Sequence, residues 1–461
     1  MECLNHRLVE LQALVTLLGS KSSPEVIDEA INAAYGLPAL DMCADVEALS
    51  QAMPPPADPD QRLQLAILQE QLANAKALLL AGSHKLALTQ AEELARKGRE
   101  LDYPPFSAEA GYLLGVLEEK AGQSERAERT LLAAARSSAR AGDDPLSARI
   151  WTALIQTVGH TKARFQEATW IGQMADAAVL RAGDKPLLRA RLDSNLGSAA
   201  WAASNTTEAY VKHVAALKVL REELGDTHPE VVLSLKNISA TLYRRGRFQE
   251  AADRSQEALE LGIAALGANH PAVALSHMNL GVSLVPVGDY DKAREHYRQA
   301  LTIAEKTYGA SHEIAGYVHA NLGELGWLQG KPEKARREYQ HAYDILEPSY
   351  GREHPMMTYP LTGLGQAHVG LGQAEPAIAA LTQAKATREE AKAEPAERAL
   401  TQFYLQRAQW LRGERDPAVL AQARAAFEVY KNDPYHLEAE VVLMQEWLAS
   451  LATEPPMPGG L

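Results

Sequence analysis

The chain has 461 residues, of which 46% are hydrophobic and 23% charged, so it can bury a large core although only 6% of its residues are aromatic. Its formal net charge of −13 disfavours nucleic acid as the default partner, because phosphate binding needs a basic face. No apolar run approaches the length of a membrane span, and the first residues do not resemble a signal peptide. We therefore expect a cytoplasmic protein with no nucleic-acid partner and no membrane insertion.

Residues 1–52 predict an N-terminal segment of about three short helices, interrupted at Gly19–Pro24 and at Gly36–Pro38. Both cysteines of the chain, Cys3 and Cys43, lie in this segment. In a cytosolic protein they would stay reduced as small core residues. The alternative is a disulfide that ties the N-terminal helices together, which requires an oxidising compartment.

Residues 53–60 are rich in proline, which interrupts a helix and marks a linker. From there the pattern is helical, and residues 61–452 predict a solenoid whose clearest repeats span 183–392. Residues 453–461 predict a disordered tail. The last helices of the solenoid are expected at residues 396–413, 417–431 and 435–451.

One pattern occurs four times between Gly225 and Lys392, at a step of 42 residues. A fixed period of this size is the signature of stacked helix pairs. Each copy begins with a glycine that ends the preceding helix in a left-handed conformation, and a second glycine separates helix A from helix B. The two series are Gly225, Gly267, Gly309 and Gly351, then Gly246, Gly288, Gly330 and Gly372.

Within helix A an apolar residue precedes a small one, as in Leu280-Gly281 and Leu322-Gly323. We expect the leucines to be buried and the glycines to permit a close crossing of helices A and B. Two prolines break the pattern: Pro286 near the end of one helix A, and Pro360 beyond the first turn of another. A kink or a shifted helix boundary is expected at both.

The recurring order is Leu-Gly in helix A, an aromatic residue after the turn, an alanine, a bulky residue such as Tyr297 or Tyr339, and a second alanine, although no single copy carries every element in its typical form. This order resembles the tetratricopeptide repeat. With the recurring His-Pro and Asn-Leu-Gly, the copies over Gly183–Lys392 are similar to the 42-residue repeats of kinesin light chains. The resemblance implies an all-α, right-handed superhelical solenoid in which helix A lines the concave side.

The sequence contains no glycine-rich phosphate loop after a strand, no His-Glu-x-x-His and no Cys-x-x-Cys motif, so we expect neither an enzyme nor a cofactor or metal site. One histidine recurs in each copy, but helices stacked about 8–10 Å apart do not bring such residues to one ion. We interpret these as turn residues: His228, His270, His312 and His354.

An asparagine also recurs in helix A, just before the apolar position. The resemblance implies a ladder of amides that binds an extended peptide, whereas hydrogen bonds between repeats that fix their stacking are the alternative. Large aromatic and basic residues at neighbouring inner positions are typical of peptide recognition. The predicted peptide-binding groove comprises Asn195, Asn237, Asn279, Asn321, Arg191, Trp201, Lys236, Tyr243, Arg244, Tyr317 and Trp327.

The stretches Cys3–Leu8 and Leu37–Leu49 resemble the region that leads into the repeats of large bacterial serine/threonine protein kinases. The kinase motifs themselves are absent, with no His-Arg-Asp and no Asp-Phe-Gly, so kinase activity is not expected. Two functions follow. The first is a non-catalytic scaffold in signalling that binds a protein or peptide in its concave groove. The alternative is a detached sensory or regulatory region of such a kinase.

Overall fold

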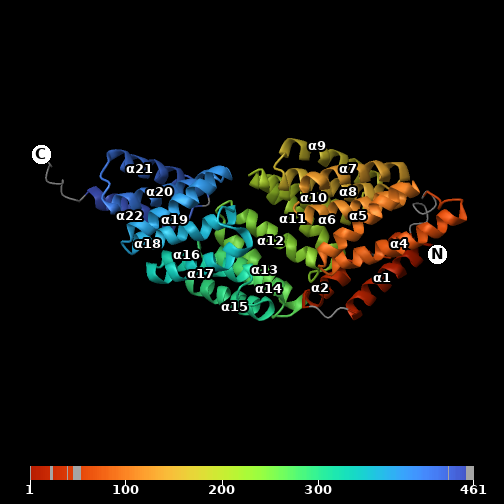
Figure 1. Cartoon of the computed structure of the whole chain (residues 1–461), viewed down its shortest axis with the longest axis horizontal. Helices are drawn as coiled ribbons and strands as arrows, with labels where there is room; N and C mark the ends of the chain where they lie inside the picture. The colour runs from red at the N-terminus through yellow and green to blue at the C-terminus, as the bar shows by residue number, and fades with distance from the viewer. Residues whose placement is uncertain (1, 21–23, 39, 45–52, 435, 453–461) are drawn as a thin grey trace. The chain divides into compact units, whose positions relative to one another are not determined.

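The structure is a computed structural model, shown in Figure 1. It divides into two compact units, Met1–Thr241 (unit 1) and Leu242–Leu461 (unit 2). The tail predicted at 453–461 lies outside the described residues. The structure describes residues 2–20, 24–38, 40–44, 53–434 and 436–452.

Unit 1 begins with α1 (Glu2–Ser20), α2 (Pro24–Tyr35) and the 3₁₀-helix η1 (Asp41–Ala44), in agreement with three short helices. Helix α1 packs against α4, the first helix of the following array. Cys3 of α1 and Cys43 of η1 form a disulfide, with their Cα atoms 5.6 Å apart. The expectation of two reduced cysteines is therefore wrong for this structure, and the disulfide alternative holds.

The remainder of unit 1 consists of consecutive helix pairs, each formed by neighbours in the chain: α4 with α5, α6 with α7, α8 with α9 and α10 with α11. The helices are α4 (Pro59–Leu80), α5 (His84–Leu101), α6 (Pro104–Lys120), α7 (Ser124–Ala141), α8 (Asp144–Ile155), the π-helix η2 (Gln156–Thr161), α9 (Phe165–Arg181), α10 (Pro186–Ala202) and α11 (Thr206–Leu224). Helix α12 (Pro229–Tyr243) ends where unit 2 begins.

Unit 2 continues the same architecture, with α14 paired with α15, α16 with α17, α18 with α19 and α20 with α21. Its helices are α13 (Phe248–Leu266), α14 (Pro271–Leu284), α15 (Tyr290–Tyr308), α16 (Glu313–Leu328), α17 (Pro332–Tyr350), the 3₁₀-helix η3 (Pro355–Met357), α18 (Thr358–Gly370), α19 (Ala374–Glu390), α20 (Pro395–Arg412), α21 (Pro417–Lys431) and α22 (Glu438–Ala452). The last three lie within a turn of their predicted positions. Among the described residues there is no strand, so the predicted all-α array of helix pairs is confirmed.

The glycine that opens each repeat has a positive φ, as predicted. At Gly267 φ is 86° and ψ is 153°, and at Gly309 they are 91° and 161°. The prediction of a left-handed helical conformation is therefore correct for φ but wrong for ψ, because the observed ψ values are extended. These residues occupy a region that is essentially restricted to glycine, so the requirement for glycine is stricter than the sequence argument supposed.

The recurring histidines cap the helices that follow them. The Nδ1 atom of His270 accepts the backbone N–H of Ala272 at 3.1 Å, and that of His312 accepts the N–H of Ile314 at 3.3 Å. A helix start leaves its first N–H groups without partners within the helix, and the imidazole satisfies one of them. The interpretation as turn residues is confirmed, with capping as their physical role.

The close crossing of helices A and B is also confirmed. Leu280 and Leu322 are buried, with 2% and 7% of their surface exposed. A Cβ atom added to Gly323 would lie 2.8 Å from the ring of Tyr339 in α17. The bulky residue of helix B therefore fills the space that the missing side chain of helix A leaves open.

Both prolines shift a helix boundary as predicted. Helix α14 ends at Leu284, so Pro286 lies beyond it. Helix α18 begins only at Thr358, after η3, so Pro360 falls within its first turn, where a proline removes no hydrogen bond. Among the described residues, no helix is both long enough and apolar enough to cross a membrane.

Substitution of Gly323 by valine should destabilise unit 2 by about 1–3 kcal/mol, because the added atoms overlap the Tyr339 ring in a packed core. Urea denaturation followed by circular dichroism measures the change. The control is Lys306→Ala on the exposed side of α15, which should leave the urea concentration at the unfolding midpoint unchanged. A Gly323→Val protein that unfolds at the same urea concentration as the native chain would refute the packing described here.

Candidate partner-binding face

The first helices of successive pairs lie side by side within each unit. In unit 1, α6 contacts α8 and α8 contacts α10; in unit 2, α14 contacts α16, α16 contacts α18, and α18 contacts α20. Side chains of different repeats therefore meet along these helices. We call the surface formed by α6, α8, α10 and α12 in unit 1, and by α14, α16, α18 and α20 in unit 2, the A-helix face of that unit.

The A-helix face of unit 1 carries basic groups next to an aromatic ring. The guanidinium of Arg149 on α8 lies 4.8 Å from the ring centre of Tyr112 on α6, a cation–π arrangement. Arg191 on α10 donates two hydrogen bonds to Glu230 on α12, at 2.7 and 3.1 Å. The predicted groove residue Arg191 is thus partly neutralised, whereas Arg149, which the sequence analysis did not select, forms no ion pair with any described residue.

Lys236 on α12 is half-buried, and burial lowers the pKa of its ammonium group. Within the part of the chain that the structure describes, no carboxylate lies at ion-pair distance from it. A partly desolvated cation without a counter-ion costs free energy, which an acidic ligand would recover. Earlier in the chain, Trp201 of α10 stacks on His160 of η2, with ring centres 6.3 Å apart.

In unit 2 the A-helix face is covered by the C-terminal helix α22. The carboxylate of Glu440, with 3% of the residue exposed, accepts hydrogen bonds from Trp327 Nε1 at 2.9 Å, from Gln366 Nε2 at 3.2 Å and from the hydroxyl of Tyr404. These donors belong to α16, α18 and α20, three successive first helices. The predicted groove residue Trp327 therefore binds a carboxylate of the same chain.

Apolar contacts hold α22 in this position. Val441 and Met444 belong to the same buried cluster as Trp327. Trp447 meets the ring of Phe403 edge-on at 5.3 Å between centres. The sequence predicts a helix at residues 435–451 but not its contacts with α16, α18 and α20. The available signal was Glu440 within an otherwise apolar stretch, because a buried charge needs several hydrogen-bonding partners.

The other predicted groove residues of unit 2 also have partners. Arg244 forms an ion pair with Glu394 at 3.3 Å. Tyr243 packs edge-on against Phe248, with ring centres 5.2 Å apart. The hydroxyl groups of Tyr317 and Tyr350 lie 2.6 Å apart, which places Tyr317 against the second helix of its own pair.

The four asparagines differ in what their side chains contact. Asn195 donates to the carbonyl of Arg191 in its own helix at 2.9 Å. Asn321 on α16 accepts a long hydrogen bond of 3.4 Å from the hydroxyl of Tyr359 on α18, a contact between repeats. The side chains of Asn237 and Asn279 form no hydrogen bond with any described residue and are only partly buried. The stacking role thus has support at Asn321, while Asn237 and Asn279 keep donors and acceptors for a ligand.

The series ends at Gly363 for a steric reason. A Cβ atom at this position would lie 2.1 Å from Cζ of Tyr339, so an asparagine cannot be accommodated. Two carboxyl groups share this region. Burial raises the pKa of Glu324 to about 7; a hydrogen bond with Tyr359 opposes the increase, and the charge of Glu440 adds to it. Burial also raises the pKa of Glu440, although its three hydrogen-bond donors oppose the shift.

A family model described as tetratricopeptide repeat matches residues 188–264, 255–306, 272–347 and 315–390. These residues therefore contain tetratricopeptide repeats, as the sequence resemblance implied. A comparison with curated proteins found no match.

Among solved structures, the apo form of RapI is similar over 82% of this chain and 99% of that one, with 13% identity and a TM-score of 0.55. Rap protein in complex with competence and sporulation factor is similar over 84% and 98%, with 13% identity and a TM-score of 0.51. The repeats of a putative kinesin light chain from Podosopora anserina match over 45% and 97%, with 20% identity and a TM-score of 0.38. At these identities, the similarity to the two Rap structures shows the fold.

Two asparagine variants separate stacking from binding. Asn321→Ala should lower the free energy of unfolding by about 1 kcal/mol, because Tyr359 loses one of its hydrogen bonds and keeps the one with Glu324. Asn237→Ala should change it by less than about 0.5 kcal/mol, since no internal hydrogen bond is lost. Urea titration of both variants measures the difference. Equal losses for the two proteins would contradict this assignment.

The raised pKa of Glu324 predicts a pH dependence of stability. The folded state retains a proton between the ordinary value of 4.5 and about 7, whereas the unfolded chain releases it, so stability falls as the pH rises through this window. Glu324→Gln should remove this loss. The free energy of unfolding of the variant should therefore be higher than that of the native chain by about 1–3 kcal/mol at about pH 8, but not at about pH 4.5. Urea titrations at both pH values test this. Exposed Glu305→Gln is the control, and an unchanged pH profile for Glu324→Gln would contradict the prediction.

Proposed function

We propose that this chain is a non-catalytic protein-interaction scaffold that binds a segment of a protein partner on the A-helix face of unit 1. The supporting observation is two cations on this face that form no ion pair with a described residue: Arg149, stacked on Tyr112, and the half-buried Lys236. Asn237, one residue from Lys236, adds an amide without an internal partner. An extended acidic segment would supply carboxylates to the cations and backbone groups to the amide.

Net charge favours a local and specific contact of this kind. The chain carries a formal charge of −13, so an acidic partner is repelled by most of the surface. The basic groups on the A-helix face of unit 1 then determine where the acidic partner binds and in which register. Such selective binding suits a role in signalling in the cytoplasm, which we include in the proposal. The kinase-associated alternative remains an untested prediction.

Unit 2 provides an internal precedent. There, Glu440 of α22 binds on the A-helix face through donors from three successive repeats. The repeats of this chain can therefore recognise a carboxylate on a helix with contacts of this type. In unit 1, no carboxylate of the described residues forms an ion pair with Arg149 or Lys236.

Selection of random peptides displayed on phage, with the full chain as bait, tests the proposal. We expect the selected peptides to be enriched in Asp and Glu, and their binding to be lost with the Arg149→Ala, Lys236→Gln double variant. Salt should weaken binding, because the contacts are charged and partly exposed.

The matched control is Arg136→Ala, which removes an exposed arginine from α7, the second helix of its pair. Lys306→Ala and Arg337→Ala, on α15 and α17, serve the same purpose in unit 2. Peptides that bind the double variant as well as they bind the native chain would overturn the proposed face. Failure to select any peptide would count against the scaffold function itself.

A further inference from the structure

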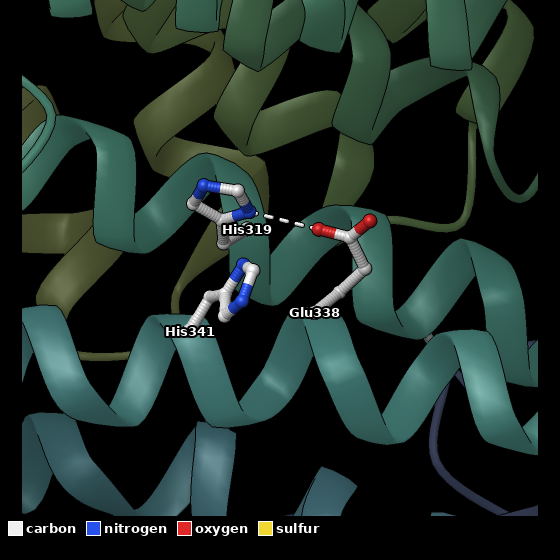
Figure 2. Close-up of side chains that lie close together, drawn as sticks. All are labelled: His319, Glu338 and His341. Atoms are coloured by element: carbon white, nitrogen blue, oxygen red, sulfur yellow. Dashed lines mark hydrogen bonds and ion pairs between the residues drawn. The ribbon is translucent and has the colours of Figure 1, made fainter.

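Three potential metal ligands meet between α16 and α17 in unit 2. His319 comes from α16, and Glu338 and His341 lie three residues apart on α17. One nitrogen of each imidazole and one carboxylate oxygen all lie within 4.8 Å of one another. Figure 2 shows the three side chains directed toward the same region, with the Nδ1 of His319 hydrogen-bonded to Glu338 at 2.8 Å.

From this geometry we propose that His319, Glu338 and His341 form a binding site for a divalent first-row transition metal, with Zn²⁺ as the best-fitting ion. Two imidazoles and one carboxylate make up a three-ligand set that leaves coordination positions for water or another ligand. This goes beyond the proposed scaffold function, since the site uses helix A and helix B of one pair and does not depend on a partner.

The helix geometry suits chelation. Residues three apart on an α-helix project from the same side, so Glu338 and His341 can approach one ion from α17 while His319 approaches from α16. Ligand bonds to zinc are about 2.0–2.2 Å long. The three donor atoms, which now lie within 4.8 Å of one another, must therefore move closer together to bind one ion. His341 is exposed and the other two are partly exposed, so small side-chain rotations can achieve this.

The protonation states also suit a cation. Burial alone would raise the pKa of Glu338, but the hydrogen bond and the charge of His319 lower it below its ordinary value, so the carboxylate is ionised. A hydrogen bond from Nδ1 of His319 to this carboxylate requires a proton on Nδ1. Metal binding at Nδ1 displaces that proton, and the neutral ring then carries its hydrogen on Nε2.

A second cluster of three possible ligands has a different explanation. His6, Glu10 and Glu109 also lie within 4.8 Å of one another. However, the ammonium group of Lys76 forms ion pairs with both carboxylates, at 2.7 Å to Glu10. A cation is already supplied by the chain at that site, whereas no lysine or arginine forms an ion pair with Glu338 among the described residues.

The preceding repeat provides a natural comparison. His277 and His296 stand 42 residues before His319 and Glu338, and their Nδ1 atoms lie 2.9 Å apart. The position that corresponds to His341 is Gln299, which hydrogen-bonds to Glu295. Facing donors thus recur in two repeats, but only the repeat of α16 and α17 adds the third ligand. The prediction of no metal site rested on the absence of metal-binding motifs and on the spacing of the capping histidines, whereas His319 and His341 belong to neither pattern.

Isothermal titration of the tag-free, chelator-treated full chain with Zn²⁺ tests the site. We expect one ion to bind per chain, and His341→Ala and Glu338→Gln each to abolish binding at concentrations that saturate the native protein. Binding of Co²⁺ should produce visible absorption bands, which those variants should lack. Thermal melts of both variants without metal show that they are folded, which the exposure of His341 favours.

The control is His277→Ala, which removes an imidazole from the two-histidine pair and should leave binding unchanged. Gln299→His should create a second site by completing that pair. Lys334→Gln should tighten binding, because the charge of Lys334 acts on Glu338 and would repel a cation bound there. Absence of binding, or binding that survives both His341→Ala and Glu338→Gln, would overturn the proposal.

Discussion

The packing of a small residue of helix A against a bulky residue of helix B determines how each pair is built. At Gly323 an added Cβ would meet the ring of Tyr339, and at Gly365 it would meet Leu381 at 2.3 Å. In both cases the bulky residue of helix B lies sixteen residues after the glycine of helix A. The same contact therefore recurs from one helix pair to the next at the period of the repeat. Since interiors are close-packed, this contact sets how near the two helices lie and which face each helix presents.

The same contact shapes the A-helix face. Tyr339 reaches past its own pair, and the end of its ring takes the space where the next repeat would carry an asparagine, at Gly363. The asparagine series and the core are therefore not independent features. At Gly363 the position of the Tyr339 ring therefore excludes a further asparagine, although Asn321 follows Tyr297 at the same spacing one repeat earlier.

Much of the fold could be predicted because glycine, proline and histidine mark the helix boundaries through backbone geometry alone, and the period then fixes equivalent positions. The contacts of Glu440 could not be predicted in this way. Its partner Trp327 is 113 residues distant, and α22 lies outside the repeat, so no periodic pattern relates the two. The pairing of Arg244 with Glu394, 150 residues later, escaped prediction for the same reason.

Functional groups of this chain occur where equivalent positions differ. Shared residues such as the capping histidines and crossing glycines have structural roles, and substituting them affects folding. Among the four copies between Gly225 and Lys392, residues that only one copy carries are of two kinds: some are structural, such as the buried Trp327, and others are exposed, such as His341. His341 replaces the Gln299 of the preceding repeat and adds a third metal ligand, while Glu440 belongs to no repeat and binds across three. In a periodic protein, a departure from the period costs little stability when the side chain is exposed, as at His341. Such positions are therefore where a repeat array can acquire a binding site without altering its architecture.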